Sequence, residues 1–273
     1  MLEGKTCIVT GANSGIGRET ALALARMKAN VVMVCRNKAK GDSARQEISK
    51  ESGNDSVDLL LCDLSSLAEV RTLAAEIRNR YGKLHVLVNN AGLFSFSGKT
   101  EDGFETTLAV DYLAPFLLTN LLLELLKAGT PSRIVNVSSV AHFNGHIDLA
   151  AMEKKETPSG WGAYSNSKLA LVMFTYELAR RLQGTGVTAN CLHPGGVATN
   201  IWRVPAAITR PFLRSAKEGA KTSIYLASSP DVEAVSGKYF EDEKEKKSSD
   251  ESYDERRARE LWDATSKLVG LSP

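Results

Sequence analysis

The sequence predicts a single α/β domain built on a doubly wound parallel sheet. Short apolar, β-branched runs alternate with longer segments of helical periodicity from Thr6 to about Val197. This alternation is typical of βαβ units, whose parallel strands are covered by helices on both faces. The chain has 273 residues and 43% hydrophobic content, enough to bury one large core. The predicted domain therefore spans residues 1–273.

Seven strands are expected, each an apolar run bounded by polar or turn residues. Their ranges are 6–10, 30–35, 57–61, 86–89, 133–137, 187–192 and, for a short last strand, about 237–240. Helical spacing predicts helices over 16–27, 38–49, 67–81, 104–126 and 164–182. Right-handed crossovers between parallel strands then place these helices on both sides of the sheet.

Three segments fall outside this alternation. Residues 141–162 separate a strand from its helix by more than the usual few residues, and residues 197–215 mix large apolar side chains with two prolines and three arginines. Loops this long in compact domains are often functional. Residues 241–254 are rich in charge, which indicates a solvated connector. The spacing of apolar residues over 255–271 predicts a final helix that packs back on the domain.

Composition argues against several classes of protein. Lys and Arg number 34 against 32 Asp and Glu. The chain therefore lacks the excess of positive charge that nucleic-acid binding usually requires. The four cysteines lie in or beside predicted buried strands without ligand spacing, so no metal site is expected; they are Cys7, Cys35, Cys62 and Cys191. Apolar runs are too short for a membrane span, and the residues before the first strand are too few for a signal peptide. We expect a cytoplasmic location.

A glycine-rich turn, TGANSGIG, joins the first strand to the first helix. Glycines at such a junction let the chain turn sharply and let a helix N-terminus approach a pyrophosphate. This is the phosphate-binding turn of a Rossmann fold. The predicted dinucleotide contacts in this turn are Gly11, Asn13, Ser14, Gly15, Ile16 and Gly17.

The end of the second strand predicts which dinucleotide binds. Arg36 stands where an acidic residue would bind the ribose 2′-hydroxyl of NAD, and no carboxylate follows until Asp42. A guanidinium binds a 2′-phosphate, so NADP(H) is favoured over NAD(H). Other predicted cofactor contacts follow the third and fourth strands, and these are Asp63, Leu64, Asn90, Ala91 and Gly92. Among them, Asp63 is expected to accept a hydrogen bond from the adenine amino group.

Tyr164 and Lys168 lie four residues apart on a predicted helix, so their side chains share one face. A phenol is a weak acid near neutral pH, and a neighbouring ammonium stabilises its phenolate. This spacing alone is weak evidence for a proton-transfer site, because any helix carries such pairs. Ser139 strengthens the evidence, because this serine ends the fifth strand, where the crevice of a doubly wound sheet lies. Ser138 is the alternative, but strand alternation turns only one of the two serines toward the site.

The chain resembles a short-chain dehydrogenase/reductase over nearly its whole length, through the motifs TGANSGIG, NNAG, IVNVSS, YSNSK and HPGGVAT. The CRN after the second strand and the late YDERRARELWDATSKLVGL resemble the retinol-dehydrogenase-like branch. The resemblance implies that Ser139 orients a carbonyl, Tyr164 transfers the proton, and Lys168 binds nicotinamide ribose and tunes Tyr164. It further implies that the nicotinamide side is lined by Pro194, Gly195, Val197 and Thr199.

One residue departs from the family pattern. Members usually have asparagine in the helix after NNAG, as a fourth catalytic residue in a water relay to the lysine. This chain has Asp111 there. A carboxylate lacks the amide donors of asparagine, and if buried beside Lys168 it would pair with the ammonium and weaken its effect on Tyr164. We expect the relay to survive through the backbone carbonyl of Asp111, at reduced rate.

The expected function is transfer of a hydride between NADP(H) and a hydrophobic carbonyl or alcohol, such as retinal or another lipid aldehyde or ketone. Residues 197–215 resemble the apolar substrate lid of the family, although Trp202 and Phe212 would also suit packing on the domain or a partner subunit. The alternatives are an NAD-linked alcohol or steroid dehydrogenase and a non-catalytic dinucleotide sensor. Relatives assemble through the helices predicted over 104–126 and 164–182, which implies a homodimer or homotetramer, but these helices also pack within each subunit.

Overall fold

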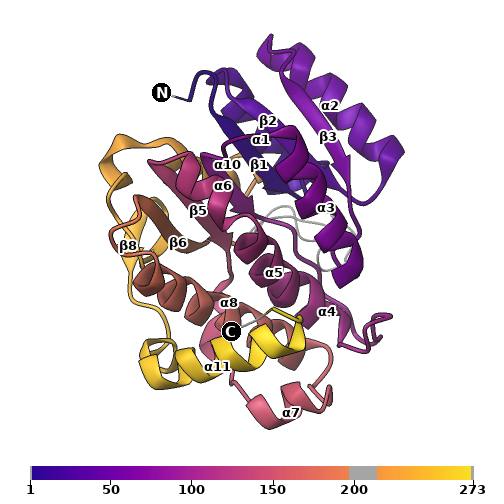
Figure 1. The fold of residues 1–273 in the computed structure, drawn as a ribbon, viewed down its shortest axis with the longest axis vertical. Coiled ribbons are helices and arrows are strands. Elements are labelled where there is room, and N and C mark those ends of the chain that lie inside the picture. Colours follow the sequence, from indigo (N-terminus) through magenta and orange to yellow (C-terminus); the bar gives the residue numbers. More distant parts are fainter. Residues whose placement is uncertain (1, 197–213, 272–273) are drawn as a thin grey trace.

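Parallel strands buried on both faces form the centre of the molecule (Figure 1). The computed structural model describes residues 2–196 and 214–271. Within them, eight strands form one sheet in the order β3-β2-β1-β4-β5-β6-β7-β8, and the pairings from β3 to β7 are parallel. The strands are β1 (Thr6–Thr10), β2 (Asn30–Cys35), β3 (Val57–Leu61), β4 (Val86–Asn89), β5 (Ser132–Val137), β6 (Val187–His193), β7 (Tyr239–Glu241) and β8 (Lys244–Lys246).

Helices cover both faces of this sheet, which confirms the predicted doubly wound α/β fold. The helices are α1 (Gly15–Arg26), α2 (Lys38–Ser52), α3 (Leu67–Arg80), α4 (Thr106–Leu108), α5 (Ala114–Leu121), α6 (Leu123–Ala128), α7 (Leu149–Glu153), α8 (Trp161–Arg181), α10 (Ala216–Ser228) and α11 (Glu255–Leu268). Short turns of other helix types are η1 (Ala109–Leu113), η2 (Val140–Asn144), η5 (Pro230–Val232) and η6 (Asp250–Tyr253).

Alternation along each strand divides the apolar side chains between two cores. In β1, Ile8 belongs to the core under α3, α5 and α8, whereas Cys7 and Val9 belong to the core under α1, α2 and α10. The final helix, α11, adds Leu261 to the first of these cores and lies beside α8 (Figure 1). The predicted final helix is therefore confirmed.

The long helix predicted over 104–126 is interrupted in the structure. Glu105 caps the first turn by accepting the Leu108 N–H, a π turn follows over Ala109–Leu113, and α5 ends at Leu121 before α6 begins. Proline at position 115 has no N–H to give to the carbonyl of Asp111, four residues earlier, so the regular helical bonding fails at this point. Turns of the π type are often found at functional sites.

The segment 241–254 has more structure than the solvated connector predicted from its charge. Residues Lys244–Lys246 form β8, which pairs antiparallel with β7 after a turn through Asp242 and Glu243, both in the left-handed region. Its charged side chains are exposed, as expected for an edge strand. Ser248 and Ser252, however, are buried, so the second half of the segment is packed against the domain. The helix α10 was also not anticipated.

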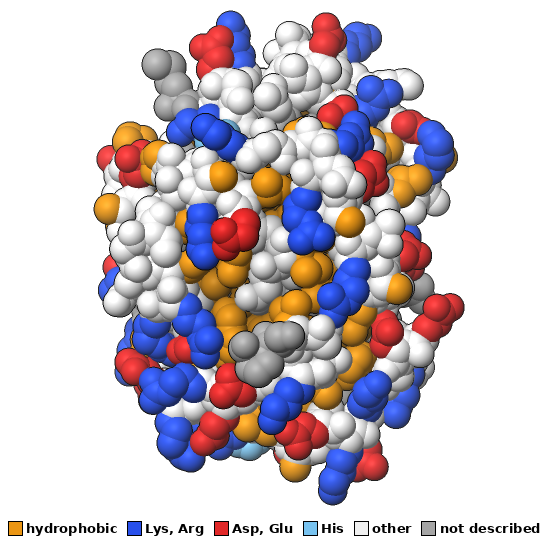
Figure 2. All heavy atoms as spheres, in the orientation of Figure 1, with side chains coloured by type: hydrophobic (Ala, Val, Ile, Leu, Met, Phe, Trp, Pro, Cys, Tyr) orange, Lys and Arg blue, Asp and Glu red, His pale blue; other side chains and the backbone are white. Residues whose placement is uncertain are grey.

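The outer surface carries both signs of charge. On the face shown in Figure 2, Lys and Arg side chains alternate with Asp and Glu around a central apolar strip. No helix in the described residues is long and apolar enough to cross a membrane.

Candidate active site

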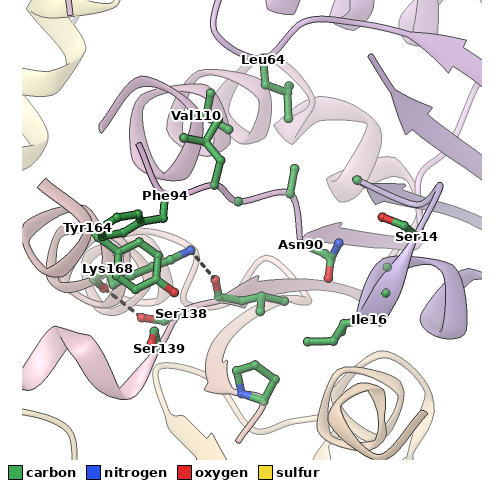
Figure 3. Close-up of a pocket in the computed structure, with 18 of the residues that line it drawn as sticks. Ser14, Ile16, Leu64, Asn90, Phe94, Val110, Ser138, Ser139, Tyr164 and Lys168 are labelled. Carbon is green, nitrogen blue, oxygen red and sulfur yellow. Dashed lines mark hydrogen bonds between the residues drawn. The ribbon is translucent and has the colours of Figure 1, made fainter. Parts of the chain in front are cut away.

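A cavity of about 1020 Å³ lies at the carboxyl ends of the strands, where the strand order reverses between β1 and β4 (Figure 3). It brings together nearly all of the residues predicted for the site. These are Gly11, Asn13, Ser14, Gly15, Ile16, Gly17, Arg36, Asp63, Leu64, Asn90, Ala91, Gly92, Ser139, Tyr164, Lys168, Pro194 and Gly195. Asp111 lies directly behind the wall of the cavity, in contact with Lys168.

The glycine-rich turn forms one end of the cavity. Gly11 and Gly15 have φ of +67° and +57°, a region that favours glycine. A Cβ on Gly17 would lie 2.4 Å from the carbonyl oxygen of Gly11, so only glycine lets α1 start this close to the turn. Ser14 precedes α1 without capping it through its side chain, and the first turn of the helix has no acidic residue. This end of the cavity therefore suits an anionic phosphate group.

Thr10, which the sequence did not single out, ties the end of β1 to the residues that follow β4. Its Oγ1 accepts hydrogen bonds from the N–H groups of Asn90 and Ala91, each at 3.0 Å, and its carbonyl accepts the Asn90 side chain at 2.8 Å. Asn90 is thus engaged in fixing the turn. A threonine closing the first strand opposite an asparagine closing the fourth is the signal that would have found this contact.

Arg36 lies at the end of β2 with 72% of its side chain exposed. Its Nη1 lies 3.5 Å from Oδ2 of Asp63, so two residues predicted to bind the cofactor pair with each other. Burial opposes ionisation of Asp63, but the Ser65 N–H and hydroxyl, with Arg36, outweigh it and lower the pKa of the carboxyl. Lys38 is paired with Asp42 at 2.6 Å, a shorter contact than that of Arg36 with Asp63, and Arg36 is the one of the two cations that lines the cavity.

The two serines after β5 have different hydrogen bonds. The hydroxyl of Ser138 is buried and donates to the carbonyl of Lys168 at 2.9 Å, which ties the strand end to α8 (Figure 3). Ser139 Oγ accepts the Ala141 N–H at 3.2 Å, and a hydroxyl that accepts one bond still has its own proton to donate. Both serines line the cavity, but Ser139 has the hydroxyl with a proton to offer there.

Tyr164 and Lys168 project from α8 toward the serines (Figure 3). The Lys168 ammonium lies 5.6 Å from the centre of the Tyr164 ring. It is 3.2 Å from the carbonyl oxygen of Val137 and 3.1 Å from Oδ2 of Asp111, and all but 5% of its side chain is buried. Burial opposes the charge of Lys168, but Asp111 more than compensates and the pKa of the ammonium is raised.

Asp111 is held in the π turn with its side chain fully buried. Oδ1 accepts the Leu93 N–H at 2.8 Å, and Oδ2 forms the ion pair with Lys168. Burial raises the pKa of this carboxyl against the opposing effects of Lys168 and the Leu93 N–H. Gly92 covers the pair, since a Cβ there would lie 3.3 Å from both charged groups. Asp111 and Lys168 thus interact directly where the family pattern places an amide.

An aromatic wall, which the sequence analysis did not predict, lines the Tyr164 end of the cavity. We use this name for Phe94, Phe96 and Trp161, which all line the cavity. The rings of Phe94 and Trp161 lie 5.9 and 6.0 Å from the ring of Tyr164, and Phe96 packs on Phe94 at 4.9 Å. Phe94 and Phe96 lie in a loop and Trp161 begins α8, so the periodic patterns of strands and helices do not predict that these rings meet.

The remaining side of the cavity follows β6. His193 ends this strand, and burial, with the nearby charge of Arg214, lowers its pKa to about 4, so the ring is neutral at neutral pH. Gly195 has φ of +82° and packs beside Arg214. Val197 and Thr199, predicted to contact the nicotinamide, and the predicted lid up to residue 213 lie outside the described residues.

The acidic, histidine and cysteine side chains give no sign of a metal centre. In the ranges 2–196 and 214–271, no group of three or more of them is placed to hold a metal ion.

Known proteins resemble this chain in both sequence and structure. A family model described as short chain dehydrogenase matches residues 5–206. Retinol dehydrogenase 14 of Mus musculus is 46% identical, over 99% of this chain and 87% of its own length. Retinol dehydrogenase 13 of Homo sapiens is 44% identical, over 99% and 86%.

Solved structures agree with this result. An uncharacterised protein from Mycobacterium paratuberculosis superposes with a TM-score of 0.82 at 33% identity, covering 99% of this chain and 95% of its own. A short chain dehydrogenase from Escherichia coli CFT073, complexed with NADPH, gives a TM-score of 0.72 at 27% identity, covering 89% and 98%.

Proposed function

The chain belongs to the short-chain dehydrogenase family, in its retinol-dehydrogenase-like branch, and on that premise we propose that it is an NADP(H)-dependent reductase of hydrophobic aldehydes or ketones. The observation that carries the proposal is the arrangement along one cavity. The glycine turn and Arg36 lie at one end, and Ser139, Tyr164 and Lys168 lie at the other. A dinucleotide bound across the strand ends would bring its nicotinamide toward Tyr164.

The residues of the cavity fit such a cofactor. The turn at Gly11 and Gly17 allows the close backbone approach that a pyrophosphate needs, and Arg36 offers a guanidinium to a 2′-phosphate. When bound, reduced nicotinamide supplies the hydride that the carbonyl carbon accepts.

The chain's own groups handle the substrate oxygen and the proton. The Ser139 hydroxyl donates a hydrogen bond to the carbonyl oxygen and orients it toward Tyr164. The Tyr164 hydroxyl then gives its proton to that oxygen as the alcohol forms. The Lys168 ammonium, 5.6 Å from the ring centre, stabilises the phenolate that remains. In the direction of oxidation the same groups act in reverse.

The aromatic wall supports an apolar substrate. Phe94, Phe96 and Trp161 offer ring faces and edges beside Tyr164, which suit a flat or extended hydrophobic carbonyl compound. Relatives named retinol dehydrogenases make retinal, a conjugated lipid aldehyde, the first substrate to test. We propose reduction as the direction, since a cell keeps NADP(H) mostly reduced.

The test is NADPH oxidation with a panel of carbonyl compounds: retinal, long-chain aldehydes, hydrophobic ketones and, as controls, small hydrophilic aldehydes. Turnover is expected with the apolar compounds. Tyr164→Phe should lower kcat by about 10³-fold, as expected for loss of a general acid, and leave NADPH affinity unchanged. A protein that binds NADPH without turnover, and whose Tyr164→Phe variant behaves identically, would be a sensor.

The pairing of Arg36 with Asp63 favours a second candidate, an NAD-linked dehydrogenase of alcohols or steroids. Because the carboxylate takes part of the guanidinium's charge, less of it would remain for a 2′-phosphate. Titration of the parent protein with NADH and NADPH distinguishes the two candidates, and tighter binding of NADH would favour the second.

A further inference from the structure

His142 is buried between the serine of the site and the C-terminal part of the chain. It lies in η2, directly after Ser139, and none of its surface is exposed. Its Nδ1 is 2.7 Å from the carbonyl oxygen of Ser139, and its Nε2 is 3.1 Å from the backbone nitrogen of Ser249. The ring also packs on Tyr239 of β7, with ring centres 4.9 Å apart.

These two bonds determine which nitrogen of His142 carries the proton. A backbone N–H can only donate, so Nε2 must be the acceptor for Ser249. Nδ1 therefore carries the proton and donates it to the Ser139 carbonyl oxygen. Burial lowers the pKa of His142, in agreement with a neutral ring.

Within the turn that carries Ser139, the Ser139 carbonyl oxygen also accepts the backbone N–H of His142 at 3.1 Å, and Ala141 and His142 are its buried side chains. Val140 and Phe143 each expose about half of their surface, and Asn144 is exposed as well. The chain before Ser139 is fixed, because Ser138 donates its N–H to Leu192 and its hydroxyl to Lys168. After Ser139, His142 is the large buried side chain of η2, so it is the main anchor on that side.

The other end of the anchor is itself rigid. The Ser248 hydroxyl bonds to the hydroxyls of Tyr176 in α8 and of Ser252, each at 2.7 Å, and the Ser248 N–H donates to Tyr253. Glu251 of the same segment accepts the Ile147 N–H and pairs with His146. Ser249 is thus part of a hydrogen-bonded segment that packs on α8 and on the loop 141–162.

We propose that His142 is a positioning residue, which holds the backbone of Ser139 against the C-terminal segment and so aims the Ser139 hydroxyl at the substrate oxygen. This inference rests on the proposed function, because it assigns Ser139 a role in turnover. It makes residues 248–253 part of the support of the active site, although they are far from Ser139 in sequence.

A matched pair of variants tests the role of His142. The side chain in His142→Asn places an amide N–H near the position of Nδ1 and can still donate to Ser139, whereas the longer side chain in His142→Gln reaches toward Ser249 and gives up the Ser139 bond. We expect kcat of His142→Gln to fall about tenfold and kcat of His142→Asn to fall less than about threefold, because turnover depends on the aim of the hydroxyl. NADPH affinity should be unchanged in both.

Two further variants distinguish a specific role of the His142–Ser249 hydrogen bond from a general loss of stability in this region. Ser249→Pro removes the N–H donor and a hydroxyl that makes no hydrogen bond within the described residues. Proline fits the φ of −61° that Ser249 already has, so this variant should lower kcat in the same sense as His142→Gln. His146→Asn breaks the contact of a neighbouring histidine with Glu251 and should leave kcat within about twofold of the parent.

The proposal is overturned if His142→Gln keeps the kcat of the parent, or if both His142 variants lose kcat and NADPH affinity together, as general unfolding would cause. The nitrogen chemical shifts of the His142 ring give an independent answer. The neutral form protonated on Nδ1 is expected, and an Nε2-protonated or charged ring would contradict the anchoring even in a protein that turns over no carbonyl compound. Failure of the proposed function is recognised separately, by a parent protein that has the expected tautomer and no turnover.

Discussion

The two ends of the cavity are built in different ways. The cofactor end consists of backbone at the ends of β1, β2 and β4, where Gly11 and Gly17 lie in contact and Thr10 bonds to Asn90. The substrate end consists of side chains: Ser139 after β5, Tyr164 and Lys168 on α8, and the aromatic wall. The loop after Phe96 is tied to the loop before α8 by Lys99, which donates to the carbonyl of Lys155. The cofactor end therefore depends on close backbone packing, whereas the substrate end depends on side chains that long-range contacts bring together.

The cofactor end could be predicted from the sequence, whereas most contacts of the substrate end could not. The glycine turn follows from short-range rules, since a left-handed or crowded backbone position requires glycine, and its predicted residues all line the cavity. The same holds for the strands, whose buried apolar runs gave bounds within one or two residues.

Long-range contacts could not be predicted in this way. Nothing in the sequence indicates that Trp161 and Phe94 meet at Tyr164, or that Ser249 bonds to His142. The charges of residues 241–254 correctly indicated exposed side chains in β8 but hid the buried serines that follow. The pairing of Asp111 with Lys168 was foreseen only as a consequence of a family pattern.

Among the variants that compare the two ends, Gly17→Ala at the cofactor end is expected to have the largest effect on cofactor binding. The new Cβ would lie 2.4 Å from the Gly11 carbonyl oxygen, which is backbone and cannot move aside cheaply. Overpacking of this kind costs about 1–3 kcal/mol, so the Kd for NADPH should rise about 10- to 100-fold. Gly53→Ala is the control, because Gly53 ends α2 with φ of +66° far from the cavity. It should lower Tm without changing Kd, and equal effects of both variants on Kd would refute the distinction.

Arg36→Ala tests the part of the cofactor end that follows β2. Loss of a charged hydrogen bond to the 2′-phosphate should raise the Kd for NADPH about tenfold and leave the Kd for NADH unchanged. Lys38→Ala is the matched control, since its ammonium is already paired with Asp42. The 2′-phosphate assignment is wrong if the parent binds NADH more tightly than NADPH and Arg36→Ala changes neither value.

Trp161→Ala tests whether the substrate end is independent of the cofactor end. Removal of a ring from the aromatic wall should raise KM for apolar carbonyl compounds about fivefold, which is the loss of roughly 1 kcal/mol of ring contact. The Kd for NADPH should not change. Met27→Ala removes an exposed apolar side chain outside the cavity and should leave KM unaltered. A parallel rise in the Kd for NADPH with Trp161→Ala would mean that the two ends are not separable.

Asp111→Asn removes the carboxylate that pairs with Lys168. Its effect on rate is expected to be the smallest among these variants. The Asp111 carboxylate raises the pKa of Lys168, so while Asp111 is ionised the pair stabilises the fold below the ordinary lysine value of 10.5, and this contribution is lost as the pH rises through the raised value. The contribution is also lost in acid, where Asp111, whose pKa is raised by burial, takes up a proton. The variant should therefore be less stable at neutral pH, and the difference in stability from the parent should shrink in strong alkali.

The same substitution should nevertheless increase kcat. An ammonium held 3.1 Å from a carboxylate is partly neutralised, and without that carboxylate more of its charge acts on Tyr164, so kcat should rise about threefold near neutral pH. Glu105→Gln is the matched control: Glu105 is another buried carboxylate of the same segment, but it caps α4 and, within residues 2–196 and 214–271, pairs with no ammonium group. If Asp111→Asn is no faster than the parent at any pH, the ion pair does not slow Tyr164, and Asp111 serves this chain as well as an asparagine would.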